Sequence, residues 1–227
     1  MRWSNGALLI AALTLAACTT RPLTPSETAF AATIVPGLDP APVRVTKGAV
    51  TGRWERTRAP RPAVACRERI FPPETAPRIP YTTAAFVLGE QMFYNRRLYA
   101  DDNVPDYPES LPLARAMLLA HELTHVWQWQ NREVTGFHPL RAVQEQRDDD
   151  PYLFDLDPPK PFLDYGYEQQ AALVEEFLCC RTLDPDGGRT AQLYALLEPH
   201  FHGLPRQSTV EKVNLPWPEA ETKGICA

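Results

Sequence analysis

Several features are missing from this chain of 227 residues, and each absence excludes a class of protein or site. The net charge is −5 and no stretch is dominated by Lys and Arg, which argues against a dedicated nucleic-acid binder. No apolar run reaches the roughly 20 residues that span a membrane. No Cys-x-x-Cys spacing is present, which argues against a cysteine-bound metal. No internal repeat is present, so one globular domain is the default for this length.

Proline, by contrast, is abundant. The 24 prolines predict a loop-rich domain with short elements instead of long bundled helices. Hydrophobic residues make up 44% of the chain, which is enough for a real core. Together with the strand and helix patterns described below, these features lead us to expect an α+β fold in which helices pack on a small sheet.

The first 17 residues have the pattern of a signal peptide. Arg2 gives a positive start, and residues 6–17 (GALLIAALTLAA) form a short apolar run. The run leads into LAAC at residues 15–18, which resembles the bacterial lipobox, where the chain is cut before the cysteine and the cysteine is lipidated. The alternative is an ordinary signal peptide in which Cys18 is incidental.

The lipobox pattern predicts where the protein is found. A lipid anchor on Cys18 would hold it on the non-cytoplasmic side of a bacterial envelope. In an organism with two membranes, Thr19 favours the periplasmic side of the outer one, because an inner-membrane retention signal usually carries Asp there. Residues 18–25 then form the lipidated start and a short tether, and residues 26–227 form a single domain.

Four further cysteines suggest disulfides. An exported compartment is oxidising, and four cysteines allow three connectivities. A bond between the neighbours Cys179 and Cys180 would strain the backbone. We therefore expect each of them to pair with either Cys66 or Cys226.

The first part of the chain has the patterns of short elements. Ser26 is a good N-cap for a short helix, and residues 42–48 (PVRVTKG) alternate as a strand does. Residues 52–80 are rich in proline and predict irregular coil. In residues 84–94, two apolar runs flank a turn at Gly89-Glu90, which predicts a hairpin.

A longer helix is expected over residues 111–132, with Ser110 as its N-cap. Apolar side chains recur there at steps of three and four and predict one buried stripe. The stripe consists of Leu113, Met117, Ala120, Leu123 and Trp127.

A long acidic connection follows, over residues 134–163. Its acidic run Asp148–Asp150 is more typical of a solvated loop than of a cation site. Asp164 is a candidate cap for a second helix over residues 165–180, and a third helix is expected over residues 190–197.

The segment LLAHELTHVWQWQ contains the spacing His-Glu-x-x-His in His121, Glu122 and His125. Positions i and i+4 of a helix share one face, so both imidazoles can bind one metal ion. Glu122 is then close enough to take a proton from water on that metal. An ordinary helix with surface histidines does not explain why these polar groups share an apolar stretch, because buried polar groups need partners. The motif therefore predicts a zinc site.

A catalytic zinc needs a third protein ligand, and Glu168 at the start of the second helix is the candidate. Ala171 and Ala172 follow it, and such small residues let two helices approach closely. Glu175 is a competing ligand. Alternatively, Glu175 and Glu176 accept the free N–H of a ligand histidine.

Three segments together resemble a known family. They are AFVLG at residues 85–89, HELTHVWQ at residues 121–128 and EQQA at residues 168–171. They are similar to the zincin-type metallopeptidases of the gluzincin sort, in which a downstream Glu completes His-Glu-x-x-His. More narrowly, they resemble bacterial peptidase-like domains of contractile-injection and Rhs-type systems. The resemblance covers residues 26–181.

This resemblance implies a zincin-like α+β fold, with a small antiparallel sheet or hairpin packed on the motif helix and on a second, ligand-bearing helix. It implies that His121, His125 and Glu168 are zinc ligands and that Glu122 is the base. It also implies that the hairpin strand forms an edge able to pair with an extended peptide. The lipoprotein start lies outside this pattern, and the cysteines and tail after residue 181 match nothing in it.

The sequence therefore predicts a lipid-anchored, extracytoplasmic, zinc-dependent peptidase that uses metal-activated water. Its substrates would be peptides or proteins, such as proteins of the envelope. Hydrolysis also requires a hydrogen-bond donor to the oxyanion, for which Tyr165, Tyr167, His200 and His202 are candidates. The alternative is a non-catalytic lipoprotein in which zinc staples two helices and which acts as a binding or secretion-accessory protein.

Overall fold

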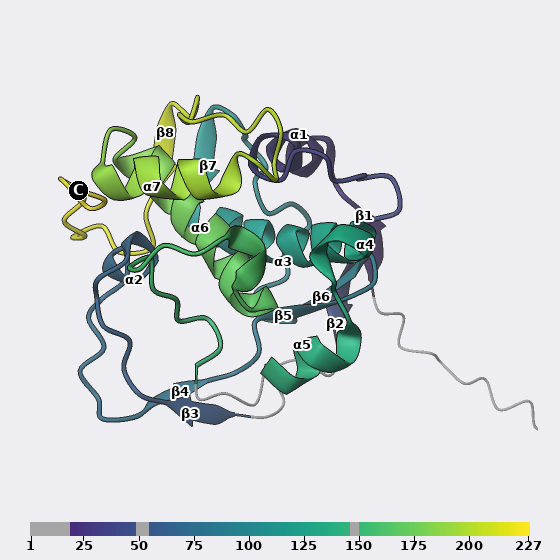
Figure 1. The fold of residues 1–227 in the computed structure, drawn as a ribbon, viewed down its shortest axis with the longest axis horizontal. Helices are drawn as coiled ribbons and strands as arrows, with labels where there is room; N and C mark the ends of the chain where they lie inside the picture. Colours follow the sequence, from purple (N-terminus) through teal and green to yellow (C-terminus); the bar gives the residue numbers. More distant parts are fainter. Residues whose placement is uncertain (1–18, 49–54, 146–149) are drawn as a thin grey trace, which may run out of the picture.

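Two long helices form the centre of the protein. The structure, a computed structural model, describes residues 19–48, 55–145 and 150–227. Helix α3 (Leu113–Gln130) packs against α6 (Tyr167–Leu183), with a sheet and shorter helices around them (Figure 1). The protein therefore has the mixed α+β architecture that the sequence predicts.

The remaining elements are short, as the proline content predicts. Outside the four-stranded sheet, β3 pairs with β4 and β7 pairs with β8. The bounds are α1 Pro25–Ile34, α2 Cys66–Arg69, α4 Arg132–Thr135, α5 Pro139–Glu145, a 3-10 turn Phe162–Asp164, α7 Gly188–Leu197, β3 Arg56–Arg58, β4 Ile79–Tyr81, β7 Ser110–Pro112 and β8 Lys212–Asn214. Within the described ranges, none of the helices combines the length and the apolar character needed to cross a membrane.

A four-stranded sheet lies beside α3. Its order is β1-β2-β6-β5, and the strands are β1 Thr20–Pro22, β2 Arg44–Gly48, β5 Ala85–Leu88 and β6 Gln91–Asn95. Strands β5 and β6 form the predicted hairpin, and Gly89 takes a positive φ of 64° in its turn. Because β2 pairs with β6 in parallel, the sheet is mixed, and the antiparallel sheet that the resemblance implied is wrong in this respect.

The predicted stripe of α3 is buried. All five of its side chains are at most 6% exposed. The predicted start is wrong, however, because α3 begins at Leu113 and Ser110 lies in β7. Residues 110–112 pair with residues 212–214, about a hundred positions later. Local sequence gives no sign of a partner so distant, whereas Ser110 beside an apolar run resembles a helix start.

Helix α1 begins earlier than the sequence predicts. Its N-cap is Thr24, whose hydroxyl accepts the backbone N–H of Glu27, while the Glu27 carboxylate accepts the N–H of Thr24. Pro25 stands at the first helical position, where its missing N–H costs nothing. The predicted cap, Ser26, lies inside the helix and donates its hydroxyl to Asp102.

Two regions expected to lack regular structure contain strands. Residues 20–22, within the predicted tether, form β1 against β2, so the sheet begins a few positions after Cys18. Residues 52–80, predicted as coil, contain α2 and the short pair of β3 and β4. Cys18 and the predicted signal peptide lie outside the described residues.

Two disulfides join α6 to α2 and to the last part of the chain. Cys66 is bonded to Cys179, and Cys180 is bonded to Cys226. This is one of the two arrangements that the sequence left open. Atoms of Cys66, Cys180 and Cys226 also lie close enough together to suggest a metal site, but their sulfurs are used in the disulfides.

Removal of each disulfide should lower the free energy of unfolding by a different amount. The chain-entropy relation gives about 5 kcal/mol for the Cys66–Cys179 loop and about 4 kcal/mol for the Cys180–Cys226 loop, because the sequence separations are 113 and 46 residues. Denaturant titration of the two double alanine variants measures both losses. A larger loss in Cys180→Ala/Cys226→Ala would contradict this order.

Candidate metal centre

Three side chains from two helices meet between α3 and α6. His121 and His125 lie one turn apart on α3, and their Nε2 atoms are 3.1 Å apart. Oε2 of Glu168 lies 3.1 Å from Nε2 of His121 and 3.3 Å from Nε2 of His125. All three residues are buried, between 6 and 8% exposed. The structure therefore brings together the three residues that the sequence proposes as ligands.

The spacing of these atoms suits a tetrahedral zinc ion. Bonds of about 2.0–2.1 Å at tetrahedral angles separate neighbouring ligand atoms by about 3.3–3.4 Å. The three separations observed here are 3.1, 3.1 and 3.3 Å. Two imidazole nitrogens and one carboxylate oxygen also match the donor set of catalytic zinc. The residues present therefore fit the ion.

Each histidine meets a hydrogen-bond acceptor at its other ring nitrogen. Nδ1 of His121 lies 3.3 Å from Oε2 of Glu175, and Nδ1 of His125 lies 2.8 Å from Oε1 of Gln128. An acceptor at Nδ1 favours a proton on that nitrogen. In a neutral imidazole with its proton on Nδ1, the lone pair is on Nε2, which in both rings is the nitrogen near Glu168 and the one that would bind a metal ion.

Charges inside this buried cluster compensate one another. Burial alone would lower the pKa of His121, but the carboxylates of Glu175 and Glu168 outweigh it and raise this pKa to about 10. Burial would raise the pKa of Glu168, but His125 and His121 hold it well below its usual range. The histidines and the carboxylates thus favour each other's charged forms. A divalent cation between the same atoms would supply equivalent positive charge.

Glu122 lies beside the histidines, and one of its carboxylate oxygens makes no hydrogen bond within the described residues. The residue is 3% exposed, and its Oε2 has no hydrogen-bond partner among the described residues. Burial raises the pKa of Glu122 to about 7, against the opposing charges of His121 and His125. A carboxyl group with a pKa near neutrality can both accept and return a proton at neutral pH.

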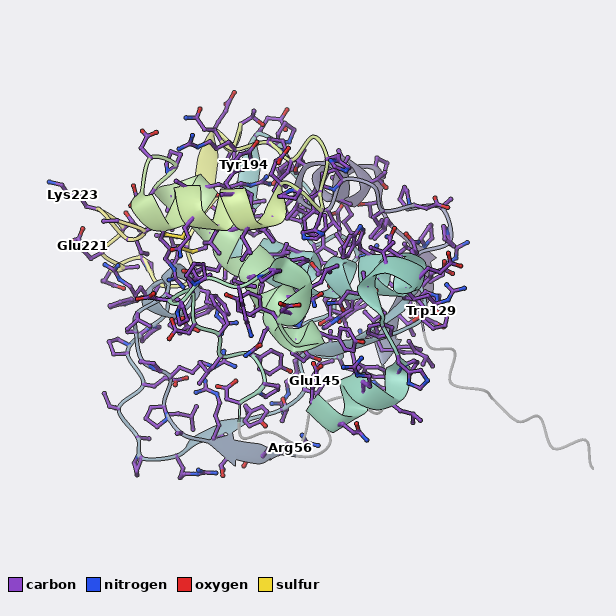
Figure 2. The ribbon with its side chains drawn as sticks, viewed as in Figure 1. Arg56, Trp129, Glu145, Tyr194, Glu221 and Lys223 are labelled. Atoms are coloured by element: carbon purple, nitrogen blue, oxygen red, sulfur yellow. A yellow bond between two sulfur atoms is a disulfide. The ribbon has the colours of Figure 1, made fainter. Side chains whose placement is uncertain are left out.

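The start of α6 is held by a carboxylate from another helix. The predicted cap, Asp164, is wrong, because α6 begins at Tyr167 with Gly166 as its N-cap. Oε2 of Glu145 accepts the backbone N–H of Tyr167 at 2.7 Å and lies 3.4 Å from the nitrogen of Glu168. Figure 2 labels Glu145 at the end of α5, beside α6. This contact positions the turn that carries the candidate ligand Glu168.

The next two acidic residues of α6 have different partners. Glu175, the competing ligand, lies on the Nδ1 side of His121 and pairs with Arg67 at 3.2 Å. It therefore occupies the position of an outer partner. Glu176 instead accepts the backbone N–H groups of Cys66 and Arg67 at the start of α2. Its predicted role beside a ligand histidine is wrong.

Three of the four candidate oxyanion donors have other contacts in the described structure. Tyr165 and Tyr167 each donate a hydroxyl to a backbone carbonyl. His200 packs its ring against Phe162, and His202 is exposed. The fold does not bring these side chains to the three candidate ligands.

No sequence pattern indicates one aromatic residue that lies near the site. The ring of Tyr152 lies 5.6 Å from the ring of His121. Arg67 donates to the carbonyl of Tyr152 at 2.9 Å, and Arg61 pairs with Asp150 at 2.7 Å. Asp150 is thus ion-paired instead of solvated, and the rest of its acidic run lies outside the described residues. These contacts join distant positions, so no local pattern indicates them.

Comparisons with family models, with curated proteins and with solved structures find no match for this chain. The zincin resemblance of its motifs therefore stays a prediction. The geometry around Glu168 and the two histidines is the basis for assigning a function.

Replacing Glu145 should destabilise the start of α6. Glu145→Ala removes the acceptor for the N–H of Tyr167 and should lower the free energy of unfolding by about 1 kcal/mol, as loss of a helix cap does. Asp164→Ala is the matched control and should leave stability unchanged. Thermal unfolding of both variants tests this. A loss in Asp164→Ala with none in Glu145→Ala would restore the sequence-predicted cap.

Proposed function

We propose that this protein is a zinc-dependent peptidase of the gluzincin type that hydrolyses amide bonds of peptides or proteins. The observation that carries the proposal is the convergence of His121, His125 and Glu168 within 3.3 Å of one another, with Glu122 beside them. Such a set supplies three protein ligands and one base, as catalytic zinc sites do.

Each residue of the set has a chemical role in this proposal. Zinc, when bound, lowers the pKa of water to about 7 and polarises a carbonyl group. His121, His125 and Glu168 hold the ion. The carboxylate of Glu122 takes the proton of the attacking water and then donates it to the leaving amine. Burial raises the pKa of Glu122, which favours holding the proton between the two steps.

The hairpin supports a peptide as the substrate. Strand β5 pairs only with β6 among the described strands and lies next to α3. An extended peptide can add to such an edge through main-chain hydrogen bonds. Phe86 and Leu88 are exposed on this strand, 40 and 65%, and offer apolar contact.

The proposed location is the bacterial envelope, with a lipid anchor on Cys18 and the domain on the periplasmic side of the outer membrane. The lipobox pattern and Thr19 support this position. Two disulfides, Cys66–Cys179 and Cys180–Cys226, suit an oxidising compartment. Proteins of the envelope are therefore the proposed substrates.

A second candidate is a non-catalytic lipoprotein in which zinc staples α3 to α6. The low exposure of the ligands favours it, because structural sites are closed. Structural zinc prefers four protein ligands, however, and the group found among the described residues has three, His121, His125 and Glu168. Because this group has three ligands, we rank the catalytic role above the structural one.

Zinc content tests the ligand assignment. The full-length protein should bind about one zinc ion per chain, and Glu168→Ala should lose it, because two histidines alone hold zinc weakly. Glu175→Gln should keep the ion with an affinity lowered by about 10–100-fold, as expected for an outer partner. Elemental analysis and competition with a chelator measure both. Zinc retained in Glu168→Ala and lost in Glu175→Gln would mean that Glu175 is the ligand and Glu168 the outer partner.

Hydrolysis tests the base. Glu122→Gln should keep zinc but lower the rate on a fluorogenic peptide library by about 10²–10⁴-fold, because an amide cannot take the proton. Glu133→Gln, an exposed residue of α4, is the control and should retain wild-type rates. Wild-type turnover by Glu122→Gln would refute the role of Glu122. Zinc binding without hydrolysis by the wild type would favour the stapled lipoprotein.

A further inference from the structure

Two fully buried glutamine side chains connect His125 to the backbone at the start of α6. Gln128 and Gln170 are each 0% exposed. Nε2 of Gln128 donates to the carbonyl of Tyr167 at 3.1 Å and to Oε1 of Gln170 at 2.9 Å. Nε2 of Gln170 donates to the carbonyl of Tyr165 at 2.7 Å. Two backbone carbonyls therefore anchor this pair of amides.

The anchors determine which way each amide points. A carbonyl oxygen only accepts, so the carbonyl of Tyr165 requires the NH2 group of Gln170, and Oε1 of Gln170 then faces Gln128. The carbonyl of Tyr167 and Oε1 of Gln170 both require the NH2 group of Gln128. Its Oε1 is left to face Nδ1 of His125 at 2.8 Å. An acceptor in that place requires a proton on Nδ1.

We infer that Gln128 is a positioning residue that holds His125 in the tautomer able to bind a metal ion. In a neutral imidazole with a proton on Nδ1, the lone pair is on Nε2. This is the nitrogen that lies 3.3 Å from Oε2 of Glu168. The inference rests on the proposed function, since it assigns Gln128 to the same metal centre.

The two histidines thus have different outer partners. His121 faces the carboxylate of Glu175, which is also paired with Arg67. His125 faces a neutral amide whose orientation depends on Tyr165 and Tyr167. The segment that leads into α6 therefore supports two ligands. It supports Glu168 through the start of the helix and His125 through the two glutamines.

Three substitutions in the full-length protein separate this role from simple packing. Gln128→Leu removes the acceptor and should weaken cobalt(II) binding by about 10–100-fold, the usual loss for an outer partner. Gln128→Glu keeps an acceptor of similar size beside Nδ1 but lacks the NH2 donor to Tyr167 and Gln170, so it should retain the tautomer and lose less cobalt affinity than Gln128→Leu does. Gln130→Leu, on the same helix but bonded to Asp39, is the matched control and should bind as the wild type does.

Cobalt(II) affinity is measured by the visible absorption of the bound ion. The tautomer is measured by nitrogen NMR of ¹⁵N-histidine protein loaded with zinc, which is tractable because the chain has 5 histidines. The expected wild-type result is a protonated Nδ1 on His125. If Gln128→Leu does not fold, Gln128→Glu and the wild-type tautomer still decide the question.

The outcomes distinguish this inference from the proposed function. A folded Gln128→Leu variant with wild-type affinity overturns the inference alone, as does an unprotonated Nδ1 in the wild type. Equal losses in Gln128→Leu and Gln128→Glu also overturn it, because the acceptor facing Nδ1 would then make no difference to metal binding. A wild-type chain that binds neither cobalt nor zinc overturns the proposed function, and the role of Gln128 with it.

Discussion

Burial of four ionisable side chains between α3 and α6 is the constraint on which the rest of the site depends. Charged groups removed from water are unfavourable unless neighbours supply opposite charge or hydrogen bonds. His121, His125 and Glu168 compensate one another, whereas Glu122 responds with a raised pKa. The contacts of Glu175, Gln128 and Glu145 also stabilise this buried cluster. Each places an acceptor beside a histidine N–H or beside the backbone N–H groups at the start of α6.

The disulfides and the candidate metal centre are connected through α6. Cys179 holds α2 by its bond to Cys66, and Glu176 accepts the first N–H groups of α2. This places Arg67 where it pairs with Glu175, the partner of His121. The segment around α2, which contains little regular structure, is thereby held beside the candidate metal centre. Cross-links compensate for the short elements that a proline-rich chain can form.

Sequence patterns predicted the elements whose stabilising contacts are local. The hairpin of β5 and β6 follows from two apolar runs around Gly89, and α3 follows from its three-and-four periodicity. Elements defined by distant partners were missed. Strand β1 requires β2, β7 requires β8, and the start of α6 requires Glu145. Local patterns instead predict Ser110 and Asp164 as caps, which the tertiary structure does not use.

For the candidate site, the sequence by itself determined that His121 and His125 share one helical face with Glu122 next to them, because a spacing of four residues is a local property of a helix. It also proposed Glu168 from its position before two alanines. Only the tertiary structure decided that Glu168, 47 residues after His121, reaches the same point. It likewise selected Gln128 as the partner of His125, since amide orientation depends on carbonyls that folding brings near.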